Sequence, residues 1–123
     1  MQHMELVLNG SVPLVLGGNV FGWTADRESS FAVLEAYTAH GGAHIDTADS
    51  YSQWAPGNAG GESETILGAW LAGVDRTPVA LATKVGQSKR RPGLAEDNIR
   101  AALADSLERL GRSSGFRGCA RTG

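Results

Sequence analysis

Apolar residues follow two patterns along this chain, continuous runs and helical periodicity, and these patterns predict strands that alternate with helices. Continuous apolar runs at residues 14–16 and 79–82 are typical of buried strands. Elsewhere, apolar residues return every three or four positions, as they do on the buried face of a helix. Three such stripes are present: Phe31, Leu34 and Tyr37; Ile66, Leu67, Trp70 and Leu71; Ile99, Ala102, Leu103, Leu107 and Leu110. The pattern therefore predicts three helices separated by strands.

The ends of these helices carry residues that commonly begin or stop a helix. Asp26 is placed to cap the first helix with its carboxylate, and the pair Gly41–Gly42 ends it. A short strand over residues 43–46 is expected to follow. The second helix is predicted to begin near Glu62, and Gly111 stands directly after the third stripe, where a glycine often terminates a helix.

The N-terminal residues predict a β-hairpin. Two apolar runs within residues 6–12 flank Asn9-Gly10, the pair that best forms a two-residue hairpin turn. The whole order is then hairpin, strand, helix, strand, helix, strand, helix. Alternating strands and helices imply an α/β fold with a parallel sheet and right-handed crossovers. Three such units fit either a doubly wound sheet or part of a (β/α)₈ barrel.

The pattern changes after Gly111. Residues 112–123 read RSSGFRGCARTG, with no alternation and no apolar run. If strands and helices kept alternating, a fourth strand would follow here, but the pattern of residues 112–123 does not predict a strand. A flexible terminus is one interpretation. We favour loss of the normal continuation, by truncation or a shifted reading frame, since a full barrel needs about 250 residues. Residues 1–111 are thus interpreted as the barrel part, and 112–123 as an irregular tail that is not native to the fold.

Composition narrows the function classes. The chain has 123 residues, enough for one small domain, and a net charge of -2 that does not favour nucleic acid or anionic membranes. No secretory signal or membrane-spanning run is visible, so a cytoplasmic location is expected. The three histidines lack a metal-ligand spacing, and the single Cys119 has no partner for an internal disulfide.

Three residues that carry chemistry are predicted to meet at one rim of the sheet. Asp46 ends the second strand, Tyr51 follows in a short loop, and Lys84 ends the third strand. In parallel α/β folds, sites are built at the carboxyl ends of the strands. An ammonium next to a phenol lowers the pKa of the phenol, and a carboxylate keeps the ammonium in place and charged. Such a phenol can donate a proton to a carbonyl oxygen.

From spacing alone, a purely structural interpretation of these three residues is about as strong. Asp46 would then cap a loop, Tyr51 would pack against its neighbours, and Lys84 would be a surface charge.

Several motifs, taken in order, resemble the N-terminal part of an aldo-keto reductase of bacterial type. The resemblance covers residues 14–110, about four-fifths of the chain. The matching stretches are 17–23 (GGNVFGW), 41–51 (GGAHIDTADSY), 60–71 (GGESETILGAWL), 81–86 (LATKVG) and 106–111 (SLERLG). The hairpin also fits, because this family closes the bottom of its barrel with one. The resemblance thus implies a partial (β/α)₈ barrel with a hairpin and about three βα units.

The resemblance also implies an activity and roles for individual residues. Members reduce aldehydes and ketones with NADPH and without a metal. Tyr51 matches the general acid-base, Lys84 the residue that tunes it, and Asp46 the partner of Lys84, close to the nicotinamide ribose. Gly22 and Trp23 match a loop beside the cofactor and the substrate. The expected partner is a small carbonyl compound. Trp54, in the loop after Tyr51, is consistent with a substrate pocket or with simple packing.

The family tetrad also contains a histidine at the end of the fourth strand, where the tail departs from the pattern. His40 and His44 do not match that position and are interpreted as structural. Most residues that grip NADPH also come from later strands, so the chain alone is expected to bind NADPH weakly and to be inactive. The alternatives are a non-catalytic truncated product, which self-associates through its open sheet edge, and a binding module.

Overall fold

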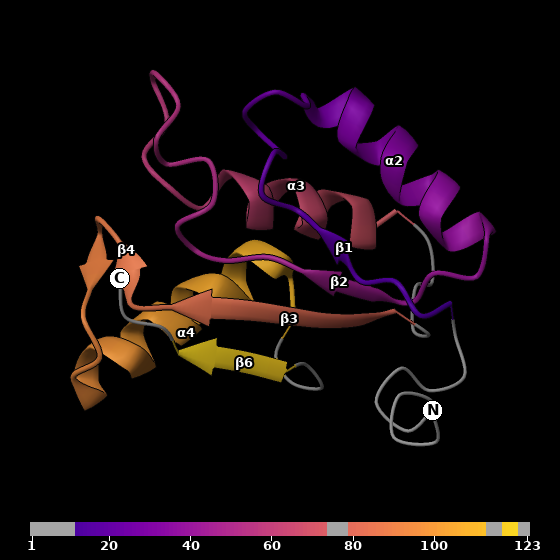
Figure 1. Ribbon diagram of the computed structural model, residues 1–123. Helices are drawn as coiled ribbons and strands as arrows, with labels where there is room; N and C mark the ends of the chain where they lie inside the picture. The colour runs from indigo at the N-terminus through magenta and orange to yellow at the C-terminus, as the bar shows by residue number, and fades with distance from the viewer. Residues whose placement is uncertain (1–11, 74–78, 113–116, 121–123) are drawn as a thin grey trace.

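The structure, a computed structural model, describes residues 12–73, 79–112 and 117–120 (Figure 1). Four parallel strands form its main sheet, in the order β1-β2-β3-β6. They are β1 (Leu16–Gly17), β2 (His44–Asp46), β3 (Ala80–Val85) and β6 (Arg117–Ala120). The predicted hairpin around Asn9-Gly10 lies outside the described residues.

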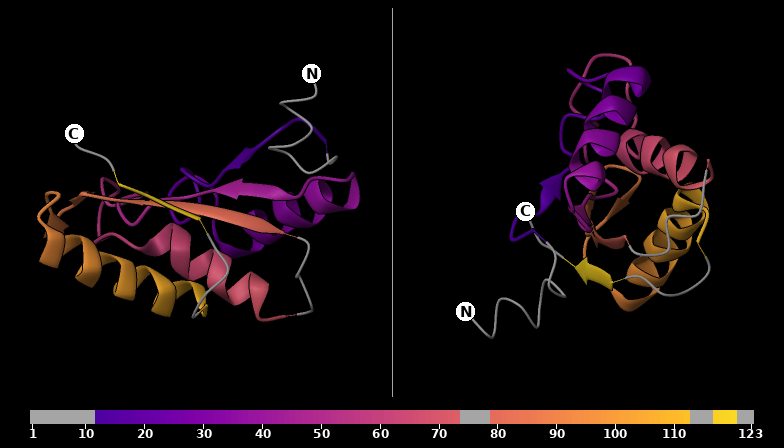
Figure 2. Two further views of the ribbon diagram at one scale, coloured as in Figure 1. Left: turned by 90° about the horizontal axis from the view of Figure 1, so that it is seen from below. Right: turned by 90° about the vertical axis from the view of Figure 1, so that its right-hand side faces the viewer.

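Three helices cover one face of this sheet. They are α2 (Arg27–Ala39), α3 (Glu62–Leu71) and α4 (Glu96–Leu110). Figure 2 shows all three on the same side, while no described helix lies over the opposite face. Each helix connects two neighbouring parallel strands, as in consecutive βα units. The predicted fold is confirmed: the chain forms an open part of a (β/α)₈ barrel.

The hydrophobic core lies between the sheet and the helices. The buried cluster contains Phe21, Leu34, Ile45, Leu67, Trp70, Val79, Leu81 and Leu110. Along β3, Leu81, Thr83 and Val85 are buried, whereas the intervening residues are partly exposed. Successive side chains of a strand point to opposite faces. Lys84 therefore lies on the face that the helices leave uncovered.

The predicted helix ends are confirmed by their geometry. The carboxylate of Asp26 accepts a hydrogen bond from the Ser29 backbone N–H at 2.8 Å, which satisfies one of the free donors at the start of α2. Gly111 follows α4 with φ of 67°, in the left-handed region that glycine adopts without strain.

The prediction of a buried strand over residues 14–16 is wrong for its first two residues. Leu14 is 61% exposed and Val15 is 50% exposed, and β1 begins only at Leu16. Within the described residues, β1 has a neighbouring strand on one side only. An apolar run at the edge of a sheet has fewer elements to pack against. The apolar run alone therefore did not indicate how far Leu14 and Val15 are buried.

The expectation that residues 112–123 contain no strand is also wrong. Arg117–Ala120 form β6, which pairs in parallel with residues 82–85 of β3. Pairing of strands uses backbone N–H and C=O groups, so a polar, glycine-containing segment can form it without an apolar pattern. Whether residues 112–123 are native to the fold stays a prediction.

The sequence pattern also did not predict the small antiparallel pair that follows β3. β4 (Gln87–Ser88) and β5 (Arg91–Pro92) form a hairpin at the carboxyl end of β3.

Among the described residues, no helix has the length and apolar content that crossing a bilayer requires.

Close contact between α3 and α4 depends on Gly68. A Cβ atom there would overlap the carbonyl oxygen of Arg109. We expect Gly68→Ala to lower the free energy of unfolding by about 1–3 kcal/mol, because the helices must move apart. Helix propensity alone would give the opposite sign, a gain of about 1 kcal/mol. Urea unfolding measures the difference. Gly17→Ala, whose new Cβ meets nothing closer than 3.8 Å, is the matched control and should change stability little.

Candidate active site

A short ion pair forms where β2 and β3 end. The ammonium of Lys84 lies 2.7 Å from Oδ2 of Asp46 and also donates to the Thr47 carbonyl oxygen at 2.7 Å. The strands place these residues side by side, since Asp46 is in register with Ala82, two positions before Lys84. The Lys84 side chain is 14% exposed and that of Asp46 is 36% exposed. The predicted pairing of Asp46 with Lys84 is therefore present in the structure.

The hydroxyl of Tyr51 joins this pair. It donates a hydrogen bond to the same Oδ2 of Asp46, at 3.3 Å. The Lys84 ammonium lies 4.7 Å from the centre of the Tyr51 ring. One carboxylate oxygen thus accepts hydrogen bonds from both a phenol and an ammonium. All three residues predicted to carry chemistry are brought together.

Lys84 remains protonated in this environment. Its burial alone would lower the pKa of its ammonium, but the hydrogen bonds and negative charge of Asp46, together with Tyr51, outweigh burial and raise that pKa above its usual value. A positive charge is therefore held beside the phenol throughout the neutral pH range.

The loop after Tyr51 is held in an unusual conformation. Ser52 is fully buried and has φ of 68°, a value that residues other than glycine rarely adopt. Its hydroxyl donates to the Phe21 carbonyl oxygen at 2.7 Å. This bond ties the loop that follows β2 to the loop that follows β1, and it compensates for backbone strain next to the candidate site.

Two exposed tryptophans extend the site at the surface. Trp54 lies edge-on to Tyr51, with 6.4 Å between ring centres, and Trp23 lies edge-on to Trp54 at 5.5 Å. Trp23 is 49% exposed and Trp54 is 46% exposed. The Asn58 amide fixes the two loops by donating to the carbonyl oxygens of Gly22 and Ser52, at 2.8 and 2.9 Å. An aromatic surface is thus held beside the Tyr51 ring.

Gly22, next to the exposed Trp23, packs closely against the start of α3. A Cβ atom on Gly22 would lie 2.7 Å from Cβ of Glu62, and its φ is 85°. Glycine is therefore required for close packing of this loop against the start of α3. The structure gives Gly22 a packing role and does not bring it to the Asp46–Lys84 pair, so its cofactor contact remains a prediction.

Polar residues of α3 that the sequence analysis did not single out support the site from the helix side. Ser63 donates to the Gly18 carbonyl oxygen at 2.7 Å and shares a 2.9 Å hydrogen bond with Thr47, the residue after Asp46. Its place on the stripe of Leu67 and Trp70 was a usable signal, because a polar residue on an apolar helix face usually has a fixed partner.

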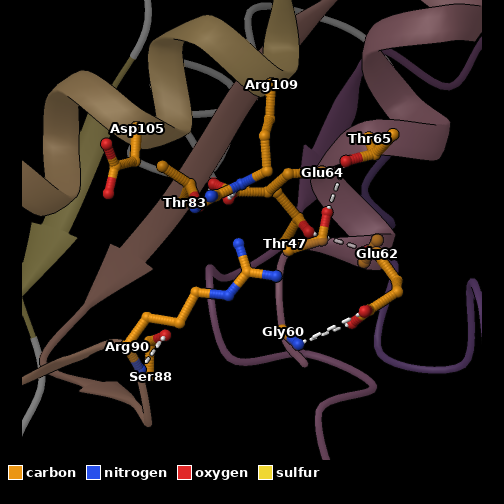
Figure 3. Close-up of polar contacts among 12 residues, drawn as sticks. Thr47, Gly60, Glu62, Glu64, Thr65, Thr83, Ser88, Arg90, Asp105 and Arg109 are labelled. Carbon is orange, nitrogen blue, oxygen red and sulfur yellow. Dashed lines mark hydrogen bonds and ion pairs between the residues drawn. The ribbon is translucent and has the colours of Figure 1, made fainter. Parts of the chain in front are cut away.

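Glu64 makes the corresponding link to β3 (Figure 3). Its carboxylate is fully buried, accepts a hydrogen bond from the Thr83 hydroxyl at 2.7 Å, and pairs with Nε of Arg109 at 2.8 Å. Thr83 directly precedes Lys84. Thr47 and Thr83, the neighbours of Asp46 and Lys84 in the chain, are therefore both hydrogen-bonded to α3.

Asp49 is a second buried acid in the loop between β2 and Tyr51. It is 2% exposed, and its Oδ2 has no hydrogen-bond partner among the described residues. Burial, followed by the negative charge of Glu64, raises the pKa of its carboxyl to about 6. A cavity of about 20 Å³ beside Asp49, Tyr51 and Lys84 has room for about one water molecule.

The two histidines have local contacts. His40 caps the end of α2, where its Nδ1 lies 2.8 Å from the Ala36 carbonyl oxygen. His44 lies in β2, where its backbone N–H donates to the Tyr37 hydroxyl. In the part of the chain that the structure describes, no three His, Cys, Asp or Glu side chains gather as metal ligands.

Comparisons with known proteins agree with this geometry. A sequence model of the aldo/keto reductase family matches residues 13–114. An uncharacterised 11.2 kDa protein of Pseudescherichia vulneris is 60% identical over 76 residues, which are 60% of this chain and 74% of that protein. The aldo-keto reductase ausK of Aspergillus calidoustus is 34% identical over 117 residues, which are 80% of this chain and 28% of that protein.

A solved structure from Pseudomonas aeruginosa, described as an aldo-keto reductase, is also similar. It matches with a TM-score of 0.72 and 27% identity, covering 89% of this chain and 42% of the other. The chain therefore spans less than half the length of this protein and of the Aspergillus relative.

The raised pKa of Asp49 predicts how stability depends on pH. The folded state binds this proton more tightly than the unfolded state, whose carboxyl titrates near 3.8. The contribution of Asp49 to stability is thus fully present below about pH 4 and is lost as pH rises through about 6. We expect Asp49→Asn to raise the free energy of unfolding at pH 7.5 by roughly 1–3 kcal/mol.

Urea unfolding between pH 4 and 8 measures this effect. Asp97→Asn, at an exposed position in the first turn of α4, is the control and should leave the shape of the pH profile unchanged. An Asp49→Asn protein whose stability falls between pH 4 and 7 as steeply as that of the parent would contradict the assignment.

Proposed function

Because this chain belongs to the aldo/keto reductase family, we propose that its site reduces an aldehyde or ketone to an alcohol, with NADPH as the hydride donor. One observation carries the proposal. The Tyr51 hydroxyl and the Lys84 ammonium share one oxygen of Asp46 on a sheet face that no described helix covers. A proton donor, a fixed positive charge and access for a small molecule are thus combined.

The proposed reaction needs one proton and one hydride. Tyr51 gives its hydroxyl proton to the carbonyl oxygen of the substrate, and a solvent proton later restores it. The ammonium of Lys84 stabilises the negative charge that this transfer leaves on the phenolate oxygen. Asp46 holds that ammonium in place. NADPH, when bound beside Asp46, would supply the hydride that the carbonyl carbon accepts.

The described residues fit one end of this cofactor. Asp46 uses Oδ2 for both of its hydrogen bonds, which leaves Oδ1 without a partner in the described part of the chain and available to a ribose hydroxyl. The family resemblance assigns most of the remaining cofactor contacts to later strands. We therefore propose that Asp46 binds the ribose and that the chain alone binds NADPH weakly.

Trp23 and Trp54 suggest which carbonyl compounds suit the site. Both rings are about half exposed; Trp54 lies edge-on to Tyr51, and Trp23 lies edge-on to Trp54. Exposed tryptophans that loops hold rigidly can pack against a flat apolar group with little further loss of entropy. We propose that an aldehyde or ketone with an aromatic or conjugated group binds there.

The second candidate function is a non-catalytic product that self-associates. The observation that favours it is the pair of open sheet edges: within the described strands, β1 and β6 each have one neighbour only. Unpaired strand edges can pair with another chain. The same assay decides between the two functions, because a folded chain with no Tyr51-dependent reduction supports the non-catalytic product.

Tyr51→Phe removes the proton donor but keeps the ring. Because the chain alone is expected to bind NADPH weakly, we expect it to be inactive at micromolar NADPH. At millimolar NADPH with 4-nitrobenzaldehyde, we expect slow oxidation of NADPH by the purified chain, and a rate at least 100-fold lower in this variant. Absorbance at the NADPH band measures the rate, and circular dichroism checks that the fold is unchanged. Oxidation that persists in Tyr51→Phe, or is absent from the parent chain, would contradict the proposed function. NADPH binding in the micromolar range would contradict the expected weak affinity.

Trp54→Ala tests the aromatic surface separately. We expect KM for 4-nitrobenzaldehyde to rise by roughly 5- to 10-fold, while KM for propanal changes less than twofold, because only the aromatic substrate loses a packing partner. Trp54→Phe, which keeps a ring, is the matched control and should restore most of the difference. Equal changes for both aldehydes would mean that Trp54 only supports the loop.

A further inference from the structure

A second hollow lies on the helix side of the sheet, away from the Asp46–Lys84 pair. It has a volume of about 450 Å³. It is bounded by the start of α3, the end of α4 and the turn between β4 and β5 (Figure 3). The lining residues are Gly22, Gly60, Gly61, Glu62, Thr65, Ile66, Arg90 and Arg109. None of these residues lines the small cavity beside Tyr51 and Lys84, so the two sites are built from different side chains.

Arg109 presents a fixed guanidinium to this hollow. Its Nε is paired with the fully buried Glu64, and its side chain is 19% exposed. The two terminal nitrogens have no acceptor among the described residues. Gly61 makes this position accessible, because a Cβ atom there would lie 2.8 Å from Nε of Arg109. The guanidinium is thus oriented by one hydrogen bond, and its terminal edge remains available.

Arg90 approaches from the opposite wall. Its side chain extends from the β4–β5 turn towards Arg109 and Gly60 (Figure 3), and its guanidinium has no acceptor within the described residues. The turn itself is anchored. Gln53 donates to the Gln87 carbonyl oxygen at 3.1 Å and accepts from the Lys89 backbone N–H at 3.0 Å. Two arginines from separate elements therefore face one hollow.

The carboxylates near these arginines are largely occupied. Glu62 accepts hydrogen bonds from the backbone N–H groups of Ala59 and Gly60, both at 2.9 Å. Glu64 is shared between Thr83 and Arg109 and does not line the hollow. The charge of Arg109 is already paired with Glu64, so Arg90 is the guanidinium of this hollow that no described carboxylate pairs. An anion beside Arg90 could also accept hydrogen bonds from the free terminal nitrogens of Arg109.

We propose that this hollow binds the phosphate group of a small phosphate monoester. A guanidinium presents parallel N–H donors that match phosphate oxygens, and two of them match a dianion. The volume of about 450 Å³ accommodates a phosphate with a small organic group and lies within the usual range for small-molecule sites. The proposed site is separate from the carbonyl-reducing site and does not rest on its activity.

Calorimetry with glycerol 3-phosphate at low ionic strength tests the proposal on the complete chain. We expect saturable binding with one molecule per chain, no binding of glycerol, and binding of acetate at least tenfold weaker. Arg90→Gln should weaken the phosphate ester at least tenfold. Lys89→Gln, the neighbouring exposed cation outside the hollow, should weaken it less than twofold.

Three results would overturn the proposal. One is absence of saturable binding by the parent chain, and another is equal weakening by Arg90→Gln and Lys89→Gln, which would indicate general attraction to a basic surface. The third is acetate binding as tight as that of the ester, which would show that the hollow does not select phosphate. Arg90 is exposed, so its variant is expected to fold, and circular dichroism checks this.

Discussion

The buried carboxylate of Glu64 connects two helices and a strand of this molecule. It lies at the start of α3, accepts a hydrogen bond from Thr83 on β3, and pairs with Arg109 on α4. A charge that is fully removed from water is costly unless it is both paired and hydrogen-bonded. Only one arrangement of α3, β3 and α4 therefore keeps this buried carboxylate both paired and hydrogen-bonded. Its contribution is to the register of two helices and a strand, more than to net stability.

The register that Glu64 fixes also orients the candidate active site, because side chains alternate between the two faces of β3. Thr83 points to the helices and binds Glu64, and its neighbour Lys84 consequently points to the uncovered face. The same alternation applies at β2, where Thr47 is fastened to Ser63 and Asp46 faces Lys84. A shift of either strand by one residue would exchange these faces and separate the ion pair. The polar contacts below the sheet thus determine the geometry above it.

Much of this arrangement could be predicted from the sequence, because it depends on periodicity and on local ends. The stripes of Leu34, Leu67 and Leu110 reported three helices correctly, and Asp26 and Gly111 reported two of their ends. The positions of Asp46, Tyr51 and Lys84 followed from strand ends and motif order. Their catalytic roles remain a proposal.

Other features depend on contacts that no local pattern encodes. β6 forms through backbone hydrogen bonds to β3, so its polar sequence gave no signal. Leu14 and Val15 have the composition of a buried strand but lie at an edge. The role of Glu64 requires knowing that Thr83 and Arg109, 19 and 45 residues away, meet at one point. The positive φ at Ser52 likewise accompanies a hydrogen bond to Phe21, which lies 31 residues earlier in the chain.

The exposure of the ion pair limits the chemistry that it can support. Electrostatic stabilisation of a developing charge is strongest where water is excluded, because a high dielectric weakens it. Asp46 is 36% exposed on the open face, so water competes with Lys84 for its carboxylate. A substrate ring packed against Trp23 and Trp54 would displace some of that water close to Tyr51. In the proposed reaction, binding of an apolar substrate and strengthening of the Lys84 charge would therefore be coupled. The aromatic surface that packs against the substrate would also lower the local dielectric constant around the transferred proton.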